Sequence, residues 1–223
     1  MRFLCLHGIG TSSQLLKMQT SALRYEFGDQ HTYEFVQGTM PWRMAPELSA
    51  ISKEEEPHYA YFDPENATGY LTAYNQLESF IAAEGPFDGV FGFSQGAGLA
   101  IIYMARKLIE TPKAPPPFRC AILFSPTAVG DPFRWFETGE MRELEALPGA
   151  ATISTPAAFI WGSKDESAPR FEALFETFDS NTSWKYVFEG GHEIPNPTIT
   201  GSMGEAIKVA RRAVTQAQRG LRQ

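Results

Sequence analysis

The amino-acid sequence predicts an α/β fold in which a mostly parallel central sheet carries helices on both faces. Short apolar runs, typical of buried strands, alternate with longer segments of helical periodicity along most of the 223 residues. Such alternation favours strand–helix–strand units, which build parallel sheets. The hydrophobic content of 43% also suits a large core and excludes a chain that is mostly disordered.

Apolar periodicity defines the elements expected in the first half of the chain. They are strands at 2–6, 32–36 and 87–93 and helices at 14–27, 67–83 and 96–109. Ser12 or Ser13 precedes the first helix as a candidate N-cap, because a serine hydroxyl can accept from a free backbone N–H there. The second helix ends at Gly85 and Pro86, since proline cannot continue a helix.

The second half of the chain continues this alternation. It is expected to hold strands at 120–124, 157–161 and 184–188 and helices at 170–178 and 204–219. Two long segments, 38–66 and 126–155, do not alternate. Irregular segments of this length are often lids or binding loops, although both could be ordinary surface excursions. With no repeat and no clear linker, we expect a single domain over 1–223 with lid or pocket insertions at these two segments.

Composition and charge exclude several classes of function. The chain has 26 acidic and 19 basic side chains, a formal charge of −7, which argues against nucleic acid as a partner. No apolar run approaches the roughly 18 residues of a membrane span, and the first apolar stretch is too short for a signal peptide. Cys5 and Cys120 are too few for a disulfide scaffold. We therefore expect a cytoplasmic protein that binds neither membrane nor nucleic acid.

The sharpest motif is Gly92-Phe93-Ser94-Gln95-Gly96, which lies between an expected strand and an expected helix. Gly-x-Ser-x-Gly in this context predicts a nucleophile elbow, in which the serine hydroxyl points out from the end of the sheet. A glycine two residues to either side of Ser94 leaves room for so tight a turn. The alternative is a glycine-rich turn with a capping serine.

A serine hydroxyl needs a base that removes its proton, and the chain offers four histidines. His192 follows the last expected strand, after two glycines that free the loop to bring the imidazole over Ser94. We therefore predict His192 as the general base. His7 is expected to be structural, and His31 and His58 are expected to be solvated surface residues.

Asp165 is the expected third member, which would orient the imidazole and stabilise its cation. It follows the strand before the last, where its alternative role is to cap the next helix. Glu166 and Asp131 are the competing carboxylates. The chain order Ser94, Asp165, His192 is the order of the α/β-hydrolase fold, which is the fold that we predict.

An oxyanion site is expected at the glycine-containing loop 7–10, after the first strand. The backbone N–H of Ile9, or alternatively of Gly10, would act together with that of Gln95. A nucleotide-binding turn is the competing interpretation, but Ser13 stands where Gly-x-Gly-x-x-Gly requires its third glycine. The sequence also has no P-loop, no His-Glu-x-x-His and no cysteine pair with metal spacing, so we expect no cofactor and no metal.

Taken together, these motifs resemble the fungal-type serine hydrolase family. The family consists of small α/β-hydrolases and includes discrete thioesterases that release polyketides from their synthases. The segments that carry the resemblance are Leu4-Cys5-Leu6-His7-Gly8, Gly85-Pro86-Phe87-Asp88-Gly89-Val90-Phe91-Gly92-Phe93-Ser94-Gln95-Gly96-Ala97 and Gly190-Gly191-His192-x-x-Pro195. The match spans nearly the whole chain and is looser at 10–12. It implies Ser94 as nucleophile, Asp165 as acid and His192 as base.

The residues predict acyl transfer, and we expect a hydrolase of an ester or thioester that works through an acyl-serine intermediate. A polyketide-type thioester of secondary metabolism is what the resemblance implies. Three alternatives stay open: a general carboxylesterase for small esters, acyl transfer or cyclisation to a substrate nucleophile, and a non-catalytic binding module.

Aromatic residues in the first irregular segment suggest a pocket for a hydrophobic acyl chain. Trp42, Tyr59, Tyr61 and Phe62 are the expected lining, and the last three resemble an aromatic segment that some family members place near the acyl pocket. An acyl carrier protein or polyketide synthase is a possible partner, which basic residues near the C-terminus could dock. Such a basic face is more often simply solvated.

Overall fold

A computed structural model describes residues 1–49, 52–53, 55–127, 129–131, 134, 138, 142–144, 146–147, 151–196 and 202–219. A six-stranded sheet at its centre has the strand order β2-β1-β5-β6-β7-β8, and each pair of neighbouring strands is parallel. The strands are β1 (Arg2–Leu6), β2 (Thr32–Val36), β5 (Gly89–Phe93), β6 (Cys120–Phe124), β7 (Ala157–Gly162) and β8 (Ser183–Phe188). The predicted parallel sheet is thus confirmed.

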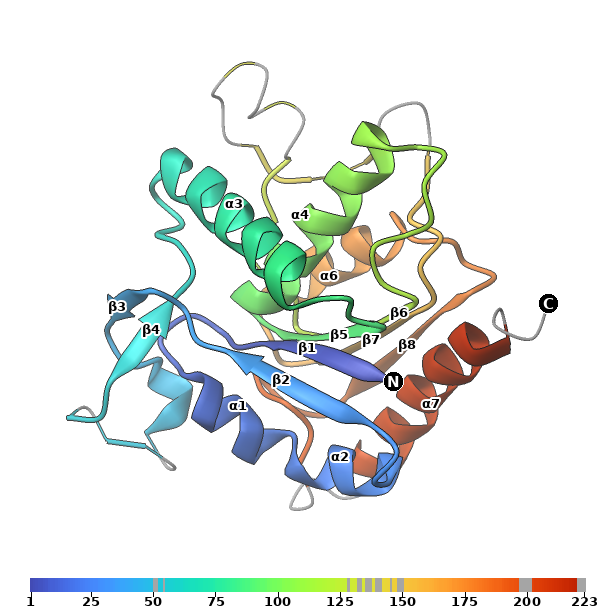
Figure 1. Ribbon diagram of the computed structural model, residues 1–223. Coiled ribbons are helices and arrows are strands. Elements are labelled where there is room, and N and C mark those ends of the chain that lie inside the picture. Colours follow the sequence, from blue (N-terminus) through green and yellow to red (C-terminus); the bar gives the residue numbers. More distant parts are fainter. Residues whose placement is uncertain are drawn as a thin grey trace.

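Helices cover both faces of this sheet, as Figure 1 shows. One face carries α3 (Ala67–Glu84), α4 (Gln95–Glu110) and α6 (Ala168–Phe175), and the other carries α1 (Ser13–Gln19), α2 (Ser21–Phe27) and α7 (Ser202–Arg219). The single helix expected at 14–27 is two helices, because the backbone leaves the helical conformation at Thr20 (φ −90°, ψ 3°). Of the described helices, none is both long enough and apolar enough to cross a bilayer.

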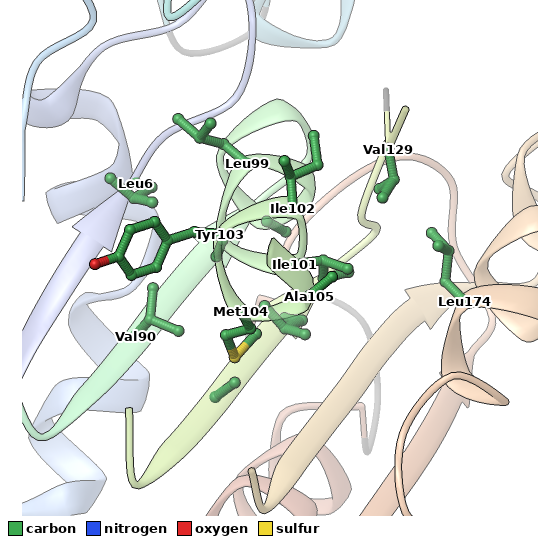
Figure 2. Packing of buried hydrophobic residues seen from close by; sticks show 14 of the residues in the cluster. Leu6, Val90, Leu99, Ile101, Ile102, Tyr103, Met104, Ala105, Val129 and Leu174 are labelled. Atoms are coloured by element: carbon green, nitrogen blue, oxygen red, sulfur yellow. The ribbon is translucent and has the colours of Figure 1, made fainter. Parts of the chain in front are cut away.

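The four inner strands β1, β5, β6 and β7 are buried on both sides, which explains why they are apolar without alternation, whereas the edge strands β2 and β8 are partly exposed. Leu4 and Leu6 of β1 pack beneath α3 and α4, whereas Phe3 and Cys5 of the same strand face α1, α2 and α7. Figure 2 shows Leu6 on the first of these faces, next to side chains of α4. Burial from both sides holds the strands rigidly, so their carboxyl ends form a fixed platform for the loops that follow.

The segment 38–66 contains short elements that periodicity did not reveal. They are β3 (Met40–Trp42), β4 (His58–Ala60) and the 3₁₀ helix η1 (Pro46–Leu48), and the two strands form an antiparallel pair. An isolated bridge between Thr11 and Tyr59 attaches β4 to the loop after β1. Elements of three residues are too short to show a period. Much of the other irregular segment, 126–155, lies outside the described residues.

Candidate active site

Ser94 lies at the tight turn between β5 and α4. Its backbone has φ 51° and ψ −119°, in the region that favours glycine and is strained for a serine. Both flanking glycines are required by close packing. A Cβ at Gly92 would lie 2.5 Å from Cα of Ala97, and a Cβ at Gly96 would lie 2.3 Å from the carbonyl oxygen of Leu6. The turn therefore has the geometry that the Gly-x-Ser-x-Gly motif predicts.

The structure brings Ser94, His192 and Asp165 into contact. His192 Nε2 lies 2.9 Å from Ser94 Oγ, and His192 Nδ1 lies 2.6 Å from Asp165 Oδ2. Asp165 follows β7 and His192 follows β8, and these two strands are neighbours in the sheet. Parallel strands end at the same edge, so loops that are distant along the chain meet beside the elbow.

Asp165 contacts both the imidazole of His192 and the backbone just before α6, whose N-cap residue is Ser167. Its Oδ2 accepts a hydrogen bond of 2.6 Å from Nδ1–H of His192. Its Oδ1 accepts a hydrogen bond of 2.9 Å from the backbone N–H of Ser167, just before α6. Burial raises the pKa of Asp165, but the hydrogen bonds from His192 and Ser167 outweigh it and hold the pKa below its usual value. The carboxylate therefore stays ionised and is aimed at the imidazole.

The loop after β1 presents backbone N–H groups beside the serine. A Cβ at Gly8 would lie 3.1 Å from Cβ of Ser94, so this loop passes directly against the elbow. In the part of the chain that the structure describes, the N–H groups of Ile9 and Gln95 have no hydrogen-bond acceptor. The N–H of Gly10 instead donates to the carbonyl of Tyr59 at 2.9 Å. Of the two alternatives for the loop donor, the geometry favours Ile9.

His7 is buried and holds this loop as a neutral ring. Its Nδ1–H donates to the carbonyl of Gly8 at 2.7 Å, and its Nε2 accepts from the backbone N–H of Gly38 at 2.9 Å. Burial lowers the pKa of His7 to about 4, so the ring carries no charge at neutral pH. These contacts agree with the structural role expected for His7.

Tyr61 and Gln95 extend the same network to the start of α4. The hydroxyl of Tyr61 accepts from the backbone N–H of His7 at 3.0 Å and donates to the carbonyl of Val36 at 2.8 Å. The side chain of Gln95 accepts from the N–H of Tyr61 at 2.8 Å and donates to the carbonyl of Phe62 at 2.7 Å. The segment after β4 thereby connects the loop at 7–10 to the elbow.

A cleft of about 1470 Å³ opens over Ser94, and we call it the active-site cleft. Of the four aromatic residues expected to line a pocket, Trp42 lines this cleft. The lining does not include Tyr59, Tyr61 or Phe62. Phe62 has no exposed surface and packs against Tyr70, with ring centroids 4.0 Å apart. The expectation for these three residues is corrected: the backbone of Tyr59 pairs with the loop after β1, the hydroxyl of Tyr61 holds the same loop, and Phe62 lies in the core.

The apolar lining of the active-site cleft is concentrated at its end beside β1. The residues Met18, Ala22, Trp42, Met44, Pro46 and Leu48 line this end, and the same segments also contribute the polar residues Gln19, Arg43, Glu47, Asp63 and Glu65. The end beside β7 and β8 is lined by Lys164, Glu166, Ser167, Glu193 and Asn196, together with the apolar Ile194. Ser94 lies between these ends because β5 lies between β1 and β7 in the sheet. We call them the apolar end and the polar end, because most of the apolar lining residues lie at the first.

Thr127 is a site residue that sequence reasoning missed. Its Oγ1 lies 3.0 Å from Ser94 Oγ, and its backbone N–H donates to the carbonyl of Ser94 at 3.2 Å. It lies in the irregular segment 126–155, where no motif marks it. Its place shortly after β6 was the one available indication, since ligands bind at the carboxyl ends of parallel strands.

Two histidines do not lie where they were expected. His31 and His58 are buried, with 8% and 4% of their surface exposed, so the expectation of solvated surface residues was wrong. His31 packs edge-on against Phe3, and Nε2 of His58 lies 3.0 Å from the hydroxyl of Ser52. Polar neighbours in sequence suggested exposure, but tertiary packing covers both rings. Within the described residues, no three His, Cys, Asp or Glu side chains are grouped so as to hold a metal ion.

A protein family and two fungal proteins match this chain over most of its length. The family described as "Serine hydrolase (FSH1)" matches residues 1–200. The chain is 39% identical to esterase FPY3 of Fusarium mangiferae, covering 97% of this chain and 98% of that protein. It is 27% identical to hydrolase FUB4 of Gibberella moniliformis, covering 87% of this chain and 92% of that protein.

Solved structures share the fold at low sequence identity. Esterase PE8 superposes with a TM-score of 0.60 at 20% identity, covering 95% of this chain and 92% of that one. A carboxylesterase from Mesorhizobium loti also has a TM-score of 0.60, at 17% identity, and covers 96% of this chain and 88% of its own. The predicted α/β-hydrolase fold is confirmed by these similarities.

Proposed function

Because this chain belongs to the serine hydrolase (FSH1) family, as its motifs predicted, we propose that it cleaves an ester or thioester of a hydrophobic acyl chain at Ser94. The observation that carries the proposal is the position of one imidazole. His192 lies within hydrogen-bond distance of Ser94 Oγ through Nε2 and of Asp165 through Nδ1. This arrangement suits a base that activates the hydroxyl while a carboxylate holds its tautomer.

Acylation begins with Ser94 donating its proton to Nε2 of His192 as Oγ attacks the carbonyl carbon. Asp165 stabilises the resulting imidazolium through Nδ1–H. The N–H groups of Ile9 and Gln95 hold the oxyanion, and a donor of this kind contributes about 3 kcal/mol to transition-state stabilisation. His192 then delivers its proton to the leaving alcohol or thiol.

Deacylation repeats these steps with a second nucleophile. Water loses a proton to His192 and attacks the acyl-serine carbonyl, and the electron pair of the breaking bond returns to Ser94 Oγ with the proton from His192. A hydroxyl or carbon nucleophile of the substrate in place of water would give a lactone or another cyclised product.

The apolar end of the active-site cleft supports a hydrophobic acyl group. Trp42, Met44 and Leu48 belong to the segment predicted as a pocket insertion, and Met18 of α1 and Ala22 of α2 line the same cleft. The polar end lies beside His192, which must protonate the leaving group. The acyl chain therefore takes the end beside β1, and the leaving group takes the end beside β7 and β8.

A polyketide-type thioester of secondary metabolism is the finer form of the proposal. Its support is the resemblance of the motifs, and fungal esterases and hydrolases are among the relatives. A substrate of this kind would be presented by an acyl carrier protein. Of the basic residues of α7, Lys208 pairs with Glu205 and Arg211 pairs with Glu26, so a carboxylate already accompanies each of these two.

Intact-protein mass spectrometry tests the proposal directly. The purified chain is incubated with N-acetylcysteamine thioesters and p-nitrophenyl esters of two to twelve carbons, and with a fluorophosphonate probe. We expect adducts on wild type that are absent from Ser94→Ala, and faster turnover of the longer acyl chains. Trp42→Ala should reduce the preference for long chains and leave acetyl esters unaffected. Labelling of Ser94→Ala equal to wild type would refute the proposal, and preference for acetyl esters would favour a general carboxylesterase.

A further inference from the structure

We propose that Thr127 is a catalytic residue whose hydroxyl donates a hydrogen bond to Ser94 Oγ while that oxygen carries negative charge. The inference rests on the proposed role of Ser94 as the nucleophile and adds a donor to it. The observation behind it is the distance of 3.0 Å between the two hydroxyl oxygens.

The direction of this hydrogen bond follows from counting protons. Asp165 is ionised and accepts Nδ1–H of His192, so Nε2 of the neutral ring has no proton and must accept. Ser94 therefore donates its own proton to Nε2, at 2.9 Å. Ser94 Oγ must then accept the hydrogen bond in its second contact, and the hydroxyl of Thr127 donates that hydrogen bond.

The hydroxyl of Thr127 is available for this role. Among the described residues, Ser94 is the hydrogen-bond partner of Thr127 Oγ1 and no other partner competes for its proton. The residue also lines the active-site cleft, so its hydroxyl lies next to the reacting atoms.

The backbone around Thr127 holds this hydroxyl in place. Its N–H donates to the carbonyl of Ser94, and its own carbonyl oxygen would lie 2.0 Å from a Cβ at Gly98 of α4. Thr127 is therefore packed against both the elbow and the helix that follows it. It lies on the β6 side of Ser94, whereas the loop with Ile9 lies on the β1 side. The donor to Oγ is thus separate from the donors to the substrate oxyanion.

The contact matters at two steps of the reaction. When the O–H bond of Ser94 breaks and its proton moves to His192, the oxygen gains charge before its bond to the carbonyl carbon is complete. When the acyl-serine bond breaks, the electron pair returns to the same oxygen before His192 protonates it. A fixed donor that faces Oγ stabilises the charge at both steps without taking part in the proton transfer.

The test compares three variants of the full chain. Thr127→Val removes the hydroxyl and keeps the shape, Thr127→Ser keeps the hydroxyl, and Thr155→Val removes a buried hydroxyl that donates to the carbonyl of Phe118 outside the cleft. We expect kcat of Thr127→Val to fall about 10-fold to 100-fold, with KM changed less than about 3-fold. Fluorophosphonate labelling should slow as well. Thr127→Ser should recover most of the kcat that Thr127→Val loses, and Thr155→Val should stay near wild type after correction for the folded fraction.

The outcomes of this test distinguish failure of the role of Thr127 from failure of the proposed function. A Thr127→Val enzyme as fast as wild type, or faster, overturns the inference and leaves the proposed function intact. Equal losses in Thr127→Val and Thr127→Ser also overturn it, because the hydroxyl would then be irrelevant. If Thr127→Val does not fold, Thr127→Ala replaces it under the same criteria. Wild type that fails to label at Ser94 overturns both the inference and the proposed function.

Discussion

The two flanks of Ser94 are built from opposite kinds of interaction. On the flank of β7 and β8, ionisable side chains meet directly, with Asp165 and His192 joined at 2.6 Å. On the flank of β1, neutral groups dominate: His7, Tyr61 and Gln95 use buried and partly buried hydrogen bonds to hold the backbone. The first flank is suited to moving a proton, and the second is suited to keeping N–H groups in position.

This difference predicts how each flank responds to mutation. Proton transfer depends on a single path through His192, so loss of one group removes the path. Several hydrogen bonds together fix the position of the loop at 7–10. Loss of one of them should therefore lower the activity without abolishing it.

Replacing the imidazole should have the largest effect. In His192→Ala no base remains beside Ser94 Oγ, and we expect kcat to fall by about 10,000-fold or more. Ester turnover with p-nitrophenyl substrates measures this loss, and thermal unfolding serves as the control for folding. A variant that retained a tenth of wild-type activity would contradict the role of His192 as the general base.

Asp165→Asn should have the second largest effect. We expect kcat to fall by about 1,000-fold to 10,000-fold, because the imidazole loses its orienting charge. Asparagine keeps an oxygen that can accept from the N–H of Ser167, so the turn before α6 should be preserved. Asp165→Ala removes this acceptor and should be about 1 kcal/mol less stable than Asp165→Asn. Urea unfolding compares the two, and equal stability would show that this hydrogen bond contributes nothing.

Tyr61→Phe tests the neutral flank and should have a smaller effect on activity, about 10-fold in kcat. It leaves the N–H of His7 and the carbonyl of Val36 without their hydroxyl partner, which should cost about 1–3 kcal/mol of stability. Tyr33→Phe is a matched control, because the buried hydroxyl of Tyr33 has no hydrogen-bond partner among the described residues. A loss of stability as large in Tyr33→Phe would contradict the interpretation.

The buried ring of His7 should make folding stability depend on pH. Its pKa is about 4 in the folded chain and about 6.5 when unfolded, so the unfolded state binds more protons between these values. Stability should therefore fall as pH decreases from about 6.5 to about 4. Between pH 7.5 and pH 5.0 this ring contributes about 2 kcal/mol of the fall.

Urea unfolding at the two pH values checks this expectation in wild type and in His7→Gln. The variant lacks the titrating ring, so its stability should change less with pH than that of wild type. His31, whose pKa is also lowered by burial and by the charged amino terminus, is present in both proteins and cancels in the comparison. An identical pH dependence in the two proteins would contradict the prediction.

The three residues of the predicted triad could be found from the sequence, because a parallel sheet brings the residues that follow its strands to one edge. Ser94, Asp165 and His192 each lie within four residues of the end of an expected strand, and such residues meet at one edge. The structure confirms that the three are in contact, while their catalytic roles stay predictions. Thr127 reaches the same edge, but a threonine after a strand is common and no motif distinguished it.

Aromatic content was a poor guide to the pocket. Trp42 lines the active-site cleft, whereas Phe62 is buried in the core and Tyr61 supports the loop at 7–10. The segment that carries them forms strands of three residues, so no period indicates which side chains face inward. Only the packing of β3 and β4 against the rest of the chain settles it.

Local sequence patterns predicted the six strands of the central sheet and most of the helices around it, the glycines that make the turn at Ser94 possible, and the three polar residues that follow β5, β7 and β8. These features depend on local periodicity and on steric limits, which are properties of short segments. The tertiary structure alone decided which backbone N–H groups remain free, which aromatic rings line the cleft, and that Thr127 touches Ser94. Those outcomes depend on contacts between segments far apart along the chain, and no local pattern encodes them.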